Sequence, residues 1–215
     1  MMTFVKQYGY YRAGTNFTRA VLEANFDCHV LVNQLGCKHD PPASWKKWLA
    51  NPDKPIPAGL PRAVENKEVR TVVTVKDPYG WLDSFLVYWQ SKLRNRTNVS
   101  TAFLQGRVKR YSQCTAAWTE RLSNAYVVPY EWLLQDLDQT VRAMGHAPAL
   151  QPRETTPVVI HERVDPNPHL RGRPFDPRYF LEREYLLNLT SNQKQVVTQD
   201  IDWNLFKRWG YEALS

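Results

Sequence analysis

The sequence predicts an α/β domain, a three-layer sandwich around a mainly parallel central sheet of about four or five strands. Two segments support this prediction, because each follows the order strand, turn and helix. They are Thr3–Phe26 and Val69–Gln90. The second begins with a dense run of β-branched residues, which is typical of a parallel strand buried on both faces.

The remaining elements are expected to cover this sheet. The apolar run at Cys28–Leu35 predicts another strand, and the Pro-rich stretch 41–68 predicts a long loop with a short helix at Ser44–Leu49. Apolar spacing and helix stop signals predict helices at 79–94, 103–123, Glu131–Met144 with a stop at Gly145, 177–189 and 191–200.

Composition limits the class of protein. The chain has 215 residues, of which 43% are hydrophobic, so we expect one domain over 1–215 with a real core. A net charge of +7 favours an anionic ligand, but does not separate a nucleotide from nucleic acid or a polyanionic glycan. The three cysteines are widely spaced and predict free thiols. No signal peptide or membrane span is recognisable, so we expect a cytoplasmic protein.

The first strand-turn-helix segment contains a candidate anion site. Its turn, Tyr8–Asn16, carries Arg12 and Gly14, and Thr15 and Asn16 stand where a helix would be capped. A helix start offers free backbone N–H groups and a positive dipole end, and Arg12 adds a full charge with a fork of donors. No Lys follows the Gly, so the segment is not a Walker P-loop. An ordinary Gly-bearing turn is the alternative.

The second segment also has a basic residue at the carboxyl end of its strand. Lys76-Asp77-Pro78 ends the β-branched run, and Ser84 follows eight positions after Lys76 on the predicted helix. Ligands of open α/β sheets bind at this edge of the sheet. Taken separately, these are an ordinary strand-end lysine and an ordinary helix serine; their order behind the first motif favours a shared site.

These motifs resemble those of the sulfotransferase family. Arg12-Ala13-Gly14-Thr15-Asn16 resembles its phosphosulfate-binding loop, [KR]-S-G-T-[TN], with Ala13 in place of Ser. Lys76-Asp77-Pro78 with Ser84 resembles its 3′-phosphate motif, in which the strand ends in Arg and a Ser follows eight positions later. Ala125–Leu134 resembles the later strand with its R-Y-E-D-L turn, and Phe206–Glu212 resembles the F-G-Y-E close of bacterial members. The likeness is to bacterial or viral members.

The resemblance implies a P-loop NTPase-like sulfotransferase fold and an enzyme that uses 3′-phosphoadenosine 5′-phosphosulfate (PAPS). A sulfuryl group would pass to a hydroxyl or amine of an acceptor, leaving the bisphosphate PAP, and no metal would be needed. The cofactor-binding residues would be Arg12, Ala13, Gly14, Thr15, Asn16 and Phe17 around the phosphosulfate, and Lys76, Ser84, Arg171, Gly172 and Arg173 around the 3′-phosphate. Arg12 would also stabilise charge on the leaving nucleotide. A solvated basic loop is the alternative for Arg171–Arg173.

The acceptor must lose a proton, and His39 is the candidate general base. Many members of the family place a His at the end of a strand beside the phosphosulfate loop, and His39 follows the strand predicted at Cys28–Leu35. Asp40 and Glu65 are the carboxylate alternatives, and Lys38 could contact an anion. A lone His in a polar loop without a catalytic role is the competing interpretation.

The acceptor itself is not specified by the sequence. Acceptor pockets are made by variable loops, here 37–68, 93–104 and 146–178, and we expect a small molecule or glycan rather than nucleic acid. Two rival classes stay open. A P-loop kinase-like enzyme predicts dependence on ATP and Mg²⁺, and a non-enzymatic binder of nucleic acid or sulfated glycan predicts steep salt dependence without nucleotide preference.

Overall fold

The computed structural model describes residues 3–42, 44–51, 55–93, 99–122, 124–147, 149–154, 156–160 and 176–215. Its centre is a sheet of four parallel strands in the order β2-β1-β3-β4. The strands are β1 (Thr3–Tyr8), β2 (Cys28–Leu31), β3 (Arg70–Val75) and β4 (Ala125–Pro129). The mainly parallel sheet expected from the sequence is confirmed.

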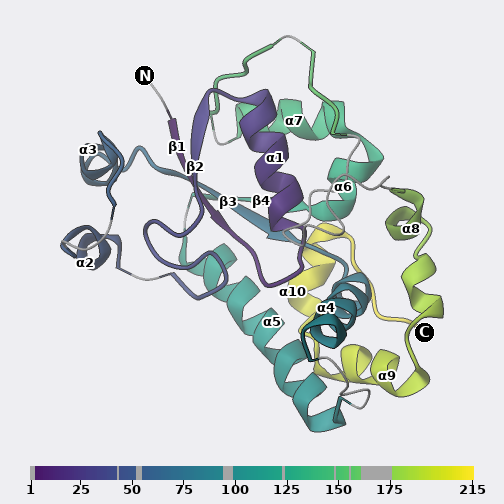
Figure 1. Cartoon of the computed structure of the whole chain (residues 1–215). Coiled ribbons are helices and arrows are strands. Elements are labelled where there is room, and N and C mark those ends of the chain that lie inside the picture. The colour runs from purple at the N-terminus through teal and green to yellow at the C-terminus, as the bar shows by residue number, and fades with distance from the viewer. Residues whose placement is uncertain are drawn as a thin grey trace.

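Helices cover both faces of the sheet (Figure 1). One face carries α1 (Thr15–Asn25), α6 (Tyr130–Gln135) and α7 (Leu137–His146). The other carries α4 (Pro78–Leu93), α5 (Thr101–Arg121), α9 (Ser191–Asp200) and α10 (Trp203–Phe206). The shorter elements are α2 (Trp45–Leu49), α3 (Leu60–Glu65), α8 (Arg178–Leu181), η1 (Glu184–Leu187) and η2 (Lys207–Trp209). The result is the three-layer arrangement predicted.

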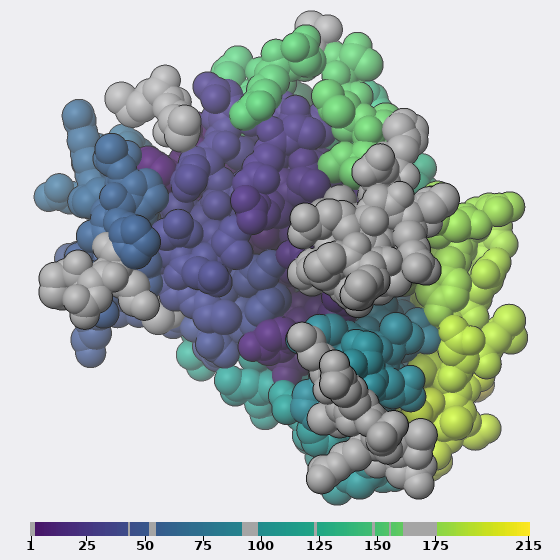
Figure 2. Space-filling model, in the orientation of Figure 1, coloured from purple at the N-terminus to yellow at the C-terminus, as the bar shows by residue number. Residues whose placement is uncertain are grey.

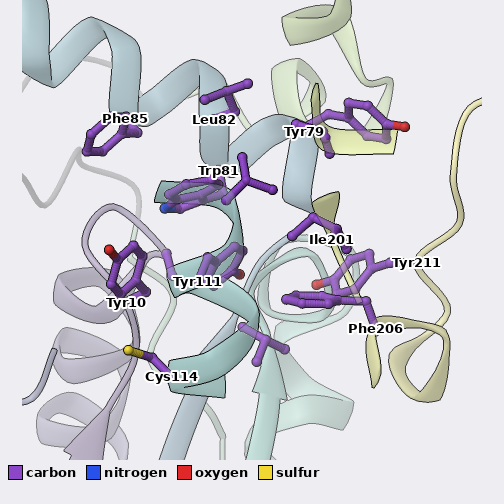
Figure 3. Close-up of a cluster of buried hydrophobic side chains, with 14 of the residues drawn as sticks. Tyr10, Tyr79, Trp81, Leu82, Phe85, Tyr111, Cys114, Ile201, Phe206 and Tyr211 are labelled. Atoms are coloured by element: carbon purple, nitrogen blue, oxygen red, sulfur yellow. The ribbon is translucent and has the colours of Figure 1, made fainter. Parts of the chain in front are cut away.

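Alternating side chains of the strands fill a large core on each face of the sheet, and Phe4 and Leu31 join a smaller cluster beside α3. Val72 packs among α1, α6 and α7, while its neighbour Val73 packs among α4, α5 and α9. Successive strand residues point to opposite faces, so an uninterrupted apolar run is what a strand covered on both sides requires. In the second core the rings of Tyr10, Trp81 and Tyr111 lie together where the turn Tyr8–Asn16, here called the phosphate-loop candidate, meets α4 and α5 (Figure 3).

The strand β2 ends earlier than the sequence predicted, at Leu31 rather than Leu35. The cause is Lys6, a fully buried residue of β1 whose ammonium donates to the carbonyls of Gln34 at 2.8 Å and Gly36 at 2.7 Å. A buried ammonium must find acceptors, and here they come from backbone that has left the sheet. The chain therefore turns after β2 and returns to the end of β1.

Helix boundaries account for the other differences. The helix expected over Glu131–Met144 is two helices, because Asp136 leaves the helical conformation and its side chain accepts the N–H of Gln139 at 2.9 Å to start α7. The stop expected at Gly145 is wrong, since α7 continues to His146. The helix expected at 177–189 is instead α8 and η1, and α3 lies in the stretch predicted to be loop.

Among the described residues, no helix has the length and apolar character that crossing a membrane would require. The free thiols expected at Cys28, Cys37 and Cys114 are present as such.

Candidate active site

The turn between β1 and α1 forms a tight loop at the carboxyl edge of the sheet. Gly14 has φ 87° and directly precedes α1, and a Cβ there would overlap the ring of Tyr130. Only Gly fits this combination of left-handed backbone and close approach. The first N–H groups of α1 have no partner within the helix and lie beside this loop, which suits them to an anion.

Arg12 stands in the same loop, also with left-handed backbone (φ 67°), a strained conformation for a residue with a side chain. Its guanidinium lies over the ring of Tyr88, 5.4 Å from the ring centre. The loop is fixed next to it, because Trp81 donates its indole N–H to the carbonyl of Tyr11 at 2.7 Å. The loop that contains Arg12 is thus held in place by α4, the helix that also carries Ser84.

Lys38 reaches the phosphate-loop candidate from the chain that follows β2. This buried lysine donates to the Asn16 side-chain oxygen at 2.9 Å, and its carbonyl accepts the N–H of Gly9 at 3.0 Å. Burial lowers the pKa of Lys38 to about 8, and the nearby Arg19 acts in the same direction. A second cation therefore lies beside the start of α1.

His39 comes next and is held by the same backbone. Its Nδ1 is 2.6 Å from the carbonyl oxygen of Gly9, and its ring stacks on Tyr11 with centres 4.1 Å apart. A carbonyl only accepts, so Nδ1 carries the proton and Nε2 is the basic nitrogen. Burial lowers the pKa of His39 to about 4, although the bond to Gly9 opposes the shift. The imidazole is therefore neutral at physiological pH.

The other carboxylates considered as bases lie differently. Asp40 is exposed and follows His39 directly, and its carbonyl is fixed by the Trp118 indole at 2.8 Å. Glu65 ends α3 shortly before β3 begins, so it lies at the amino edge of the sheet, away from the loop of Arg12. His39 is the better placed of the candidates.

Lys76 and Ser84 are brought together as their spacing implied. The ammonium of Lys76 donates to the Ser84 hydroxyl at 2.8 Å. Lys76 directly follows β3, and Ser84 lies on α4. Lys76 is only 2% exposed and lies under Phe180, with its nitrogen 4.0 Å from that ring's centre, and beside Tyr130 at 5.0 Å. Its backbone N–H and carbonyl both pair with the hydroxyl of Tyr111.

Charged groups surround Lys76 in the interior. Burial lowers its pKa to about 7, Glu131 opposes this shift, and Arg12 adds to it. Burial raises the pKa of Glu131 to about 7, against the hydrogen bond from Tyr211 and the charge of Lys76. Arg12 and Lys76 therefore lie close enough for their charges to interact, which places the two sequence motifs in one electrostatic site.

Several site residues were not foreseen in these roles. Arg183 pairs with Asp77 at 3.2 Å, and Asp77 in turn accepts the first N–H groups of α4. Nothing in the sequence marks Arg183 or Phe180, because they lie in or just after the short helix α8, about a hundred residues after Lys76 in the chain. Glu131 had a signal, since it lies two positions after β4 in the segment that resembles the R-Y-E-D-L turn. Arg171, Gly172 and Arg173 lie outside the described residues, and Ala13 and Phe17 are buried beneath the loop.

No cluster of metal-ligating side chains occurs in the part of the chain that the structure describes. The sequence matches no protein-family model and no curated protein. The structure is similar to the crystal structure of mouse sulfotransferase SULT7A1 complexed with PAP, with a TM-score of 0.55 and 14% sequence identity. The match covers 96% of this chain and 84% of the mouse chain. The chain therefore has a sulfotransferase-like fold, a four-stranded parallel sheet layered between helices.

Proposed function

We propose that this protein is a sulfotransferase that moves a sulfuryl group from PAPS to a hydroxyl or amine of a small-molecule or glycan acceptor. The observation that carries the proposal is the pairing of two anion-binding positions. The loop with Arg12 follows β1, and Lys76, which is paired with Ser84, follows β3. The strands β1 and β3 are neighbours in the sheet, so the two positions lie at the same edge. A nucleotide with phosphates at both its 5′ and 3′ positions has charges to match both.

The residues present fit such a donor. The glycine at position 14 lets backbone N–H groups approach a ligand where a side chain would block the turn. Lys76 is a buried ammonium whose polar partner is a single serine hydroxyl among the bonds described, so a phosphate would give it an anionic partner in direct contact. Asn16 and Lys38 add a further donor pair at the first position.

When bound, the donor supplies an activated sulfuryl group whose departure leaves negative charge on the nucleotide phosphate. Arg12 and the N–H groups of Gly14, Thr15 and Asn16 would stabilise that charge, and Arg12 would do so without giving up a proton. Lys38 would add a positive charge next to Asn16, whose side-chain oxygen accepts its hydrogen bond. His39 would take the acceptor proton at Nε2, since Nδ1 is held by Gly9.

Lys76 and Ser84 would recognise the 3′-phosphate and so separate this donor from ATP. The kinase-like alternative is less well supported, because Thr15 follows Gly14 where a Walker loop has Lys. The non-enzymatic alternative predicts neither the neutral His39 nor the buried Lys76. Location in the cytoplasm and a single domain over the whole chain stay predictions of the sequence.

Calorimetric titration with PAP, ADP and ATP in the absence of metal tests the donor site. We expect PAP to bind at least tenfold more tightly than ADP, and Lys76→Ala or Ser84→Ala to remove that preference while leaving ADP binding unchanged. Equal affinity for the three nucleotides, or no binding of any, would reject the proposal.

A further inference from the structure

Glu131 is a half-buried residue of the site to which the proposed sulfotransferase mechanism gives no role. It is the second residue of α6, two positions after the end of β4, and each of its oxygens accepts a hydrogen bond from a different part of the chain. Oε1 accepts the backbone N–H of Asp77 at 3.2 Å, and Oε2 accepts the hydroxyl of Tyr211 at 2.5 Å. Asp77 directly follows Lys76, so Glu131 holds the backbone at the point where Lys76 leaves the sheet.

We propose that Glu131 is a positioning residue of the 3′-phosphate site, which keeps the buried Lys76 ammonium charged and aimed at Ser84. Tyr211, near the end of the described chain, orients this carboxylate. The inference rests on the proposed function, because it assigns Lys76 to a phosphate of the donor.

The hydrogen bonds favour an ionised Glu131. Both partners donate to it, and two donors stabilise a carboxylate over the neutral acid. An ionised Glu131 offsets the burial of Lys76, which by itself disfavours the charged ammonium. The two aromatic faces beside Lys76 add a weaker attraction of the same sign.

The other charged groups around Lys76 do not replace Glu131. Arg12, from the phosphate-loop candidate, opposes the charge on Lys76, while Asp77 and Asp83, from the start of α4, favour it more weakly than Glu131 does. Asp77 is itself paired with Arg183, and Asp83 accepts the hydroxyl of Tyr179 at 2.7 Å. Tyr111 and Tyr211 are neutral, because burial raises the pKa of each phenol well above its usual value.

Removing the charge of Glu131 should therefore affect PAP binding in a pH-dependent manner. Glu131→Gln keeps the size of the side chain and can still accept from Asp77. The ammonium of Lys76 then loses a counter-charge and its pKa falls further, so the protonated form is lost at a lower pH. Since each pKa unit is a tenfold change in protonation, we expect PAP affinity to drop about three- to tenfold at pH 8 and to approach the wild-type value near pH 5.5.

The experiment compares PAP affinity from pH 5.5 to 8.5 in wild type, Glu131→Gln, Tyr211→Phe and the surface control Glu120→Gln. Tyr211→Phe removes one donor and should shift affinity in the same direction by less, and it serves if Glu131→Gln folds poorly. Titration of PAP itself cancels in the ratio between variants. In a Lys76→Met background, Glu131→Gln should have no further pH-dependent effect.

A ratio of wild-type to Glu131→Gln affinity that is constant over pH would overturn the inference, and a constant deficit would mean that Glu131 only supports the fold. A uniform gain in affinity would also overturn it, because Glu131 would then merely repel the ligand. Failure of the wild type to bind PAP at any pH would instead reject the proposed function, so the two failures are distinguishable.

Discussion

Arg12 gives the first prediction for a single residue. In the proposed mechanism, Arg12→Ala removes the charge and donors that would face the negative charge on the leaving nucleotide, so we expect transfer from PAPS to fall by about 10²- to 10³-fold. The folded state should lose little, because the left-handed backbone at position 12 is equally strained with either side chain. Steady-state rates and thermal unfolding measure the two effects.

Arg142→Ala is the matched control for that variant. Arg142 pairs with Asp138 on the exposed face of α7, and its loss should leave the rate unchanged. If Arg12→Ala retains more than about a tenth of the activity, the phosphate-loop assignment is wrong.

His39 gives a prediction about pH. If His39 is the base, only its neutral form accepts a proton, and its pKa of about 4 means that this form dominates at every pH above that value. We therefore expect a pH–rate profile in which kcat is constant from pH 6 to 8 and decreases below about pH 5. His39→Ala should reduce kcat strongly while PAP affinity changes little.

An exposed histidine with its ordinary pKa would instead place the fall between pH 6 and 7. A kcat that is unaffected by His39→Ala would move the base to Asp40.

The same pKa shift makes the stability of the fold depend on pH. The pKa of His39 in the folded state lies below that of the unfolded chain, so protonation favours unfolding. The contribution of His39 is fully present above about pH 6.5 and decreases as the pH falls toward 4.

At the scale of single residues, sequence motifs predicted which positions gather but not what surrounds them. Arg12, Lys76 and Ser84 were placed by local order and spacing, because strand, turn and helix bring such residues to one edge. Glu131 and Phe180 touch Lys76 or its neighbours only through tertiary packing. No local pattern specifies such contacts.

The start of α1 supplies the prediction at the scale of an element. Gly14→Ala forces a side chain into the ring of Tyr130 at a left-handed position, so we expect a loss of about 2–4 kcal/mol in the free energy of unfolding. Chemical denaturation measures it. Gly106→Ala is the control, because Gly106 lies within α5 with no atom within 4 Å of the added methyl group.

The control should be more stable than wild type by about 0.5–1 kcal/mol, since Ala is the better helix former. Equal effects of the two substitutions would mean that the loop yields easily and that its tight geometry is not what shapes the anion site.

Element boundaries were the weaker part of the sequence prediction. The strong β-branched run of β3 and the long amphipathic α5 fell close to their predicted ranges. The break at Asp136 depended on a capping bond that competes with helix continuation, and the early end of β2 depended on the buried ammonium of Lys6. Both are decided by single polar groups that a periodic pattern does not weigh.

At the scale of the whole molecule, alternation of strands and helices was enough to predict the layered parallel sheet. Right-handed crossovers leave few arrangements for such a chain, and the carboxyl ends of β1 and β3 then lie side by side. Figure 2 shows the N-terminal residues at the centre of the face, between the α2 and α3 region on the left and the C-terminal segments on the right. The acceptor was not predictable, because it depends on loops rather than on this framework.

A crystal structure of the protein with PAP would test the proposed donor site most sharply. We expect the 5′-phosphate at Arg12 and the N–H groups of Gly14, Thr15 and Asn16, and the 3′-phosphate at Lys76 and Ser84. The ring of Phe180, now 4.0 Å from the Lys76 nitrogen, should move aside to admit that phosphate. A PAP molecule bound elsewhere, or one whose 3′-phosphate leaves Lys76 and Ser84 paired only with each other, would show that these residues do not form the donor site.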